Sequence, residues 1–208
     1  GSLESVRARS MRVHLLTRLA QFDAAESELG RLRSVIDPGC VHQRHALAKA
    51  EASYSFNRSQ FADAVPELRT ALSTLDASEP GNRPLSDSLR VDLVVALGYS
   101  GQHAAARDEA EKIIAEARQR AGDHALLVAL TQLAVARSYS YLDDEARTEA
   151  LPQEARPVIV ERLGEGHTRY LGLLNELMAV YFRRSDWERA LPLAVEVHER
   201  VRARLGET

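Results

Sequence analysis

The sequence predicts an all-α protein built from about five helical hairpins that follow one another along the chain. Apolar residues recur at helical spacing through most of the 208 residues. A unit of two helices joined by a polar turn is repeated at a nearly constant interval. Aromatic residues make up only 5% of the chain, while alanine and leucine dominate, which favours closely stacked helices over sheets.

The clearest copy of the hairpin is the segment 163–205. Its first helix carries Leu174 and Leu177 on one face, a polar turn follows, and the second helix carries Leu193 and Val197. The two apolar faces can pack against each other. This segment therefore serves as the reference for the repeats that precede it.

A small residue in the second helix of each hairpin gives the repeat interval. Counting back from Ala190, Thr148, Ala106 and Ala64 follow at steps of 42 residues, and Ala25 follows at a final step of 39. Four of these five residues are alanine, which allows two helices to approach closely. The predicted repeats span residues 3–39, 41–80, 85–122, 123–164 and 165–206, with boundaries that are approximate.

The repeats indicate a single domain over residues 3–208. Gly1 and Ser2 resemble a cloning remnant, and the chain stops where a further repeat would begin, so we expect a fragment of a larger protein. The longest loop, 76–84, contains Pro-Gly and Arg-Pro sequences. If the domain has a hinge, we expect it in this loop.

Repeat four departs from the pattern. Its second helix must fit between Asp143 and Gly164, yet it contains Pro152 and Pro157. An interior proline costs a helix about 3 kcal/mol. We therefore expect this helix to be kinked or split near Pro157, with residues 158–163 completing it. A harmless irregularity packed by its neighbours is the simpler interpretation, and a functional bend is the alternative.

The hairpin resembles a tetratricopeptide repeat, with a large residue at Tyr181, an aromatic residue at Trp187 and a small residue at Ala190. The step of 42 exceeds the common period of about 34 and is similar to that of kinesin light chains, which the LGEGH and ALPL segments also resemble. Thr168 stands where that family usually has proline. The resemblance therefore concerns the architecture and not the cargo, and it implies a right-handed α-solenoid whose first helices line a concave groove.

The family's groove positions, counted back from each small residue, select the candidate binding residues. They are Arg7, Ser10, His14, Arg18, Lys49, Ser53, Asn57, Val91, Val95, Tyr99, Arg137, Tyr141, Asn175 and Arg183. The charged members are all basic although the net charge is −3, so we expect a protein or peptide partner with acidic groups or a free carboxylate. The alternative is that these arginines form solvated helix faces in an arginine-rich protein.

The sequence offers no catalytic, cofactor-binding or metal-binding motif. Cys40, His42 and His45 come closest to a metal site, but zinc needs three or four ligands and no strong fourth one is near. A nucleophile motif, a glycine-rich phosphate loop and an HExxH sequence are all missing. We therefore expect no enzyme activity, no cofactor and no metal.

Charge and hydropathy restrict the partners. A net charge of −3 argues against nucleic-acid binding by this segment. No apolar run approaches 18 residues and no signal peptide is present, so we expect no membrane insertion. The lone Cys40 excludes an internal disulfide but does not identify the compartment. We expect the cytoplasm, or the periplasm if a membrane span precedes the repeats.

The sequence thus predicts a non-catalytic, protein- or peptide-binding scaffold. Lysine occurs only at Lys49 and Lys112 beside many arginines, a bias associated with GC-rich bacteria. The resemblance implies the sensor or interaction part of a bacterial signalling or transcription-regulatory protein. Two alternatives stay open: a switch gated by a bound peptide, and a self-association module, since an uncapped repeat end exposes apolar surface.

Overall fold

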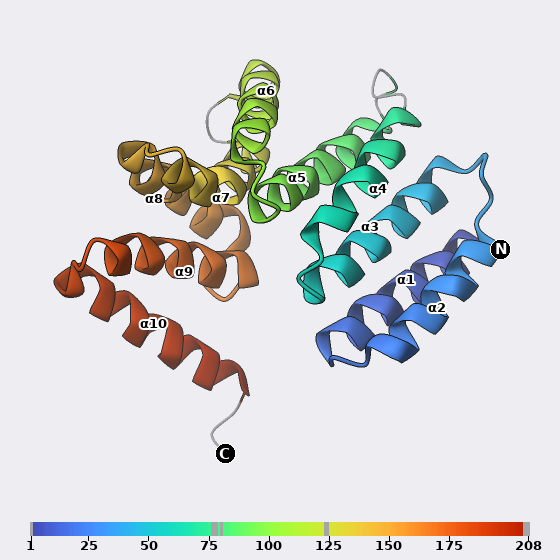
Figure 1. Cartoon of the computed structure of the whole chain (residues 1–208), viewed down its shortest axis with the longest axis horizontal. Coiled ribbons are helices and arrows are strands. Elements are labelled where there is room, and N and C mark those ends of the chain that lie inside the picture. The colour runs from blue at the N-terminus through green and yellow to red at the C-terminus, as the bar shows by residue number, and fades with distance from the viewer. Residues whose placement is uncertain (1, 76–78, 80, 123–124, 206–208) are drawn as a thin grey trace. The chain divides into compact units, whose positions relative to one another are not determined.

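The computed structural model describes residues 2–75, 79, 81–122 and 125–205, with only the backbone at 137, 204 and 205. Within these ranges it contains ten α-helices and no strand, which confirms the all-α prediction (Figure 1). The helices are α1 (Leu3–Arg18), α2 (Phe22–Val35), α3 (Val41–Asn57), α4 (Phe61–Ser73), α5 (Arg83–Tyr99), α6 (His103–Ala121), α7 (Leu126–Tyr141), α8 (Glu145–Leu163), α9 (Thr168–Arg183) and α10 (Trp187–Leu205).

The helices group into two compact units. Unit 1 comprises Gly1–Gln102 and holds α1 to α5, and unit 2 comprises His103–Thr208 and holds α6 to α10. In unit 1, α3 packs against α1, α2, α4 and α5. In unit 2, α7 packs against α6, α8 and α9, and α9 also packs against α8 and α10. The division falls within the third predicted repeat, and the single domain over residues 3–208 stays a prediction.

The same turn follows α1, α3, α5, α7 and α9. One residue in each turn has a φ between 56° and 81°, and these residues are Ala20, Ser59, Gly101, Asp143 and Ser185. They are separated by 39, 42, 42 and 42 residues, the interval predicted from the small residues. In each turn the next backbone N–H donates to a carbonyl in the last turn of the helix, which satisfies a group that would otherwise lack a partner.

The five small residues that set the interval are all buried, as the repeat pattern requires. Ala25, Ala64 and Ala106 are fully buried, and Thr148 and Ala190 nearly so. Thr148, the exception to alanine, donates its hydroxyl to the carbonyl of Asp144 at 2.8 Å within its own helix. The extra polar group therefore has a partner and the close packing is preserved.

Helix α8 runs unbroken from Glu145 to Leu163 through both of its prolines, so the predicted split near Pro157 is wrong. Ala155 and Ile159 in this stretch are fully buried in the core that also contains Tyr170 of α9. Tertiary burial of one helix face can outweigh a local cost of this kind. A bend at Pro157 stays a prediction.

Two other predictions fall partly outside the described residues. The loop expected to hold a hinge includes residues 76–78 and 80, which lie outside, while its Arg83 and Pro84 form the start of α5. At a helix start the missing N–H of proline costs little. Residues 123 and 124, the start of the fourth predicted repeat, also lie outside, and α7 is described from Leu126.

Candidate functional site

The predicted groove positions on α1 form a basic face. Arg7 and Arg18 are exposed and His14, half-buried, lies between them in the sequence. Their spacing of 7 and 4 residues places all three on one side of the helix. Within the part of the chain that the structure describes, neither arginine has an ion pair. Two uncompensated guanidinium groups are therefore available to a partner from α1.

The positive charge of Lys49 on α3 is less available to a partner, because it is paired within the structure. Its Nζ atom lies 2.5 Å from Oδ2 of Asp92 on α5, and both side chains are mostly buried. The sequence prediction missed Asp92 because it selected the adjacent Val91. Asp92 follows Lys49 by 43 residues, one more than the repeat interval of 42. A search one interval after Lys49 that allowed an error of one residue would therefore have found this acid.

Two histidines lie near the Lys49–Asp92 pair. Burial is the main cause that lowers the pKa of His14 and of His45, the positive charge of Lys49 adds to it, and Asp92 opposes it. The pKa of His45 falls to about 4. The His45 ring is therefore neutral at pH 7, and its buried Nε2 has no hydrogen-bond partner among the described residues.

Among the other predicted positions in unit 1, Ser10 and Val91 are buried and Ser53 and Val95 are half-buried, while Asn57 and Tyr99 lie at the ends of α3 and α5. Asn57 is exposed and donates its side-chain amide to the carbonyl of Ser53 at 2.8 Å. Tyr99 is exposed, and its ring stacks on Phe61 of α4 with the centroids 4.5 Å apart. One face of the Tyr99 ring is thus used for packing between helices.

Unit 2 carries the other predicted positions. Tyr141 at the end of α7 is exposed and stacks on His103 of α6. Asn175 and Arg183 are exposed on α9, and within the described residues Arg183 has no ion pair. The side chain of Arg137 lies outside what the structure describes.

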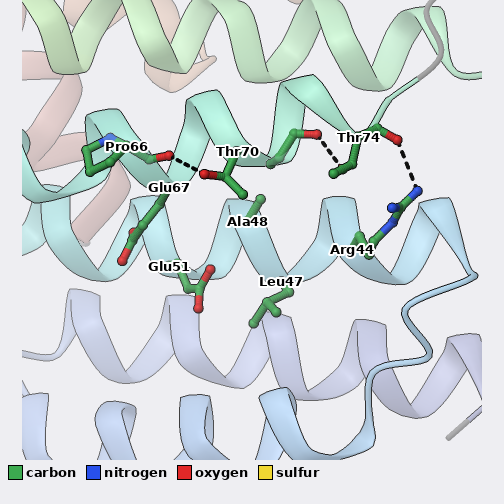
Figure 2. Close-up of a pocket in the computed structure, with 9 residues that line it drawn as sticks. Arg44, Leu47, Ala48, Glu51, Pro66, Glu67, Thr70 and Thr74 are labelled. Carbon is green, nitrogen blue, oxygen red and sulfur yellow. Dashed lines mark hydrogen bonds between the residues drawn. The ribbon is translucent and has the colours of Figure 1, made fainter.

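A cleft that the sequence did not indicate lies between α3 and α4 in unit 1 (Figure 2). It encloses about 400 Å³ and its walls are mainly apolar. Its lining comprises Arg44, Leu47, Ala48, Glu51, Pro66, Glu67, Thr70, Ala71 and Thr74. Figure 2 shows the carboxylates of Glu51 and Glu67 toward one end, while Arg44 donates to the carbonyl of Thr74 at the other.

Glu67 is the chemically distinctive residue of this cleft. Burial, followed by the negative charge of Glu51, raises the pKa of its carboxyl group. Its Oε2 atom is buried and has no hydrogen-bond partner among the described residues. Glu51 is itself held by Arg33 at 2.8 Å. Of the two carboxylates at this end of the cleft, that of Glu51 is thus paired with a cation, and the Oε2 atom of Glu67 is shielded from solvent.

A second cleft, in unit 2, is lined by α6, α7 and α8 and encloses about 550 Å³. Its walls are mostly polar and include Arg147, Glu154 and Tyr139. The Tyr139 hydroxyl donates to Glu111 at 3.0 Å, and burial together with this bond raises its pKa to about 12. This phenol stays protonated at neutral pH.

Neither a metal cluster nor a membrane span is found in the described part of the chain. Among its residues, no group of three or more His, Cys, Asp or Glu side chains could hold a metal ion. Cys40, considered above with His42 and His45, is half-buried at the residue preceding α3. The described helices also include none that is long and apolar enough to span a bilayer.

Comparison with known proteins shows similarity at the level of architecture. No family model matches the chain, and no curated protein matches it. The crystal structure of BtubC (BKLC) from P. vanneervenii is 21% identical with a TM-score of 0.60, and the match covers 100% of this chain and 76% of that one.

Two structures described as a Podospora anserina "putative kinesin light chain" with nearly identical TPR-like repeats are similar as well. One is 17% identical with a TM-score of 0.58 and full coverage of both chains. The other, a variant with one glutamine replaced by methionine, is 17% identical with a TM-score of 0.61, and the match covers 99% of this chain and 98% of that one. All three matches extend over the whole chain or nearly so.

Proposed function

We propose that this chain, which is a tetratricopeptide-like repeat domain, is a non-catalytic scaffold that binds a protein or peptide. Repeats of this kind present successive helices to a partner and bind through extended surfaces. The observation that carries the proposal is that Arg7 and Arg18 on α1, and Arg183 on α9, are exposed at predicted groove positions. Within the described residues none of the three has an ion pair.

The same observation defines the chemistry of the partner. Exposed guanidinium groups without an internal counter-ion favour a segment that carries carboxylates or a free C-terminus. Lys49 contributes less to this preference because Asp92 balances its charge. The exposed Asn57 and Asn175 add amide groups that can bond to an extended peptide backbone. An acidic, extended peptide is therefore the class of ligand that we propose.

A peptide library displayed on phage tests this proposal without a known partner. Selection on the immobilised chain should enrich sequences rich in Asp and Glu, or ending in a free carboxylate where the library exposes one. The same selection on an Arg7→Glu chain or on an Arg18→Glu chain should weaken this enrichment. Arg69→Glu on α4 is a suitable control. It changes the net charge by the same amount as each single substitution, but this exposed arginine lies on a second helix. Enrichment of neutral or basic sequences by the unmodified chain would contradict the proposal.

The cellular setting we propose is the sensor or interaction part of a bacterial signalling or transcription-regulatory protein, acting in the cytoplasm. It is supported by the arginine-rich composition and by the resemblance of the repeats to those joined to effector domains in such proteins. A peptide-gated switch, in which the bound peptide changes the pitch of the repeats, is the alternative. Hydrogen exchange with and without an enriched peptide separates the two: a switch protects helices distant from the peptide, and a scaffold protects only those in contact.

A further inference from the structure

Two exposed apolar stripes lie on the first and last helices of the structure. The stripe on α1 consists of Met11, Leu15 and Leu19, which are 60%, 54% and 66% exposed. The stripe on α10 consists of Trp187, Leu191 and Val195, which are 56%, 66% and 48% exposed. Both sets have i, i+4, i+8 spacing, so each forms a line along one side of its helix. Exposed lines of large apolar side chains are characteristic of interaction surfaces.

Two of the three residues of the α10 stripe correspond to a surface that α4 buries, while Val195 is equivalent to the exposed Arg69 of α4. Trp187 and Leu191 are equivalent to Phe61 and Val65 of α4. In each pair, the first residue stands three positions before the small residue of its repeat and the second stands one position after it. Phe61 stacks on Tyr99 of α5 at 4.5 Å, and Val65 is only 4% exposed. This side of α4 is thus covered by the first helix of the next repeat.

Residues of the α1 stripe are equivalent to residues with which other first helices contact the second helix of the preceding repeat. Leu15 is equivalent to Tyr54 of α3, whose hydroxyl bonds to Glu26 of α2 at 3.2 Å. Leu19 is equivalent to Arg184 of α9, which forms ion pairs with two carboxylates of α8. Internal first helices therefore use this side to contact the second helix of the preceding repeat.

The two stripes are chemically matched to each other. Two internal joints, α2 with α3 and α8 with α9, use hydrogen bonds or ion pairs at these positions, whereas the α4–α5 joint and both stripes are mainly apolar. Against a helix that carries charged groups at these positions, an apolar stripe would bury those groups without partners. Contact with another apolar stripe gives the larger favourable free energy, because both apolar surfaces leave water. Among the described helices, α10 packs only against α9 and α6 only against α7, while α2, α4 and α8 each pack against two helices.

We infer that the α10 stripe of one copy packs against the α1 stripe of a second copy, forming one more joint between repeats. The occupant of each stripe is thus a second copy of this chain, joined head to tail. Such a joint is heterologous, because each copy uses two different surfaces and keeps one of each free to continue. Trp187 would occupy the position of Phe61 and would face Arg18, the residue equivalent to Tyr99, in a cation–π contact.

Sedimentation of three single-residue variants tests the joint. The unmodified chain should show a mass that rises with concentration, while Leu15→Glu and Leu191→Glu should each remain monomeric. Ala203→Glu adds the same charge to an exposed position of α10 away from the stripe and should assemble like the unmodified chain. Both leucines are exposed, so circular dichroism should show unchanged helix content in the variants.

Mixing the two monomeric variants gives the sharpest result. Leu15→Glu retains an intact α10 stripe and Leu191→Glu retains an intact α1 stripe, so an equimolar mixture should form a 1:1 dimer and nothing larger. Trp187 is the only tryptophan of the chain. If the second partner also carries Trp187→Phe, the emission of the first should shift to shorter wavelength as its indole is covered.

Two results would overturn the inference. One is a monomeric mass for the unmodified chain at every concentration. The other is assembly that persists in Leu15→Glu but not in Leu191→Glu, since that pattern indicates contact between two α10 stripes. High salt should leave the joint intact, because it is apolar, whereas binding of an acidic peptide should weaken. Salt dependence therefore separates this joint from the proposed peptide binding.

Discussion

The imidazole of His103, the first residue of α6, stacks on the ring of Tyr141, the last residue of α7, with the centroids 4.2 Å apart and the planes 3° apart. Phe61 and Tyr99 make the equivalent stack in unit 1, between the first residue of α4 and the last residue of α5. Each unit thus uses a pair of rings at the same repeat positions to join a second helix to the first helix that packs on it.

Removing the ring of Tyr141 should destabilise unit 2. We expect Tyr141→Ala to lower the free energy of unfolding by about 1 kcal/mol, the usual contribution of an aromatic pair. Tyr141→Phe keeps the ring and should stay within a few tenths of a kcal/mol of the unmodified chain. Urea unfolding followed by circular dichroism measures both. Equal losses in the two variants would show that the hydroxyl, and not the stack, is responsible.

Glycine should be more stable than alanine at the left-handed residue of two repeat turns. Ala20 and Gly101 have φ values of 56° and 81°, in a region that costs a residue with a side chain about 1 kcal/mol or more. Ala20→Gly should therefore raise the free energy of unfolding, and Gly101→Ala should lower it by about 1 kcal/mol. A Cβ atom at Gly101 would meet nothing within 4 Å, so the backbone alone is tested. A neutral Gly101→Ala change in urea unfolding would contradict the assigned turn.

Acid should weaken the chain partly through His45. Its pKa falls from 6.5 in the unfolded chain to about 4 in the folded one, so between these values the unfolded state binds more protons. The free energy of unfolding should therefore fall as the pH is lowered from 6.5 to 4, with a contribution from His45 of at most about 1.4 kcal/mol per pH unit. His45→Gln should reduce the slope in a series of urea titrations. An identical slope in both chains would show that His45 does not titrate in this way.

Glu67 should have the opposite dependence on pH. Because burial raises the pKa of its carboxyl group in the folded chain, its charged form disfavours folding, and the loss of stability grows as the pH rises through the folded pKa. Glu67→Gln should therefore raise Tm at pH 7 and have little effect below the unfolded pKa of 4.5. Thermal melts at pH 7 and pH 4 make the comparison. A lower Tm for the variant at pH 7 would indicate that the carboxylate has a stabilising partner.

The helices, their turns and the repeat interval could be predicted because local sequence determines them. Apolar spacing identifies a helix face, and the small residue at Ala64 or Ala106 marks a close contact in every copy. The tetratricopeptide-like resemblance was confirmed by structures with whole-chain similarity. The predicted split of α8 was wrong, because the cost of Pro157 is local but the burial that compensates it comes from α9.

The candidate binding surface was less predictable, because it depends on neighbours that are distant in sequence. Lys49 was predicted as a groove residue, but in the fold its ammonium group is paired with the carboxylate of Asp92. No sequence motif marks the cleft at Glu67. Its lining consists of ordinary residues of α3 and α4, and only the packing of these two helices brings them together. The exposure of Arg7, Arg18 and Arg183 is likewise a property of the fold, and their role in binding stays a prediction.

The most direct measurement of the central claim is the affinity of a fluorescein-labelled, glutamate-rich peptide, followed by anisotropy at low and high salt. The unmodified chain should bind it, with affinity that falls roughly tenfold or more as salt is raised. Arg7→Glu and Arg18→Glu should each weaken binding at low salt by a similar factor, while Arg69→Glu should leave it unchanged. Binding that does not depend on salt, or that all three substitutions reduce equally, would contradict a basic peptide-binding surface on α1.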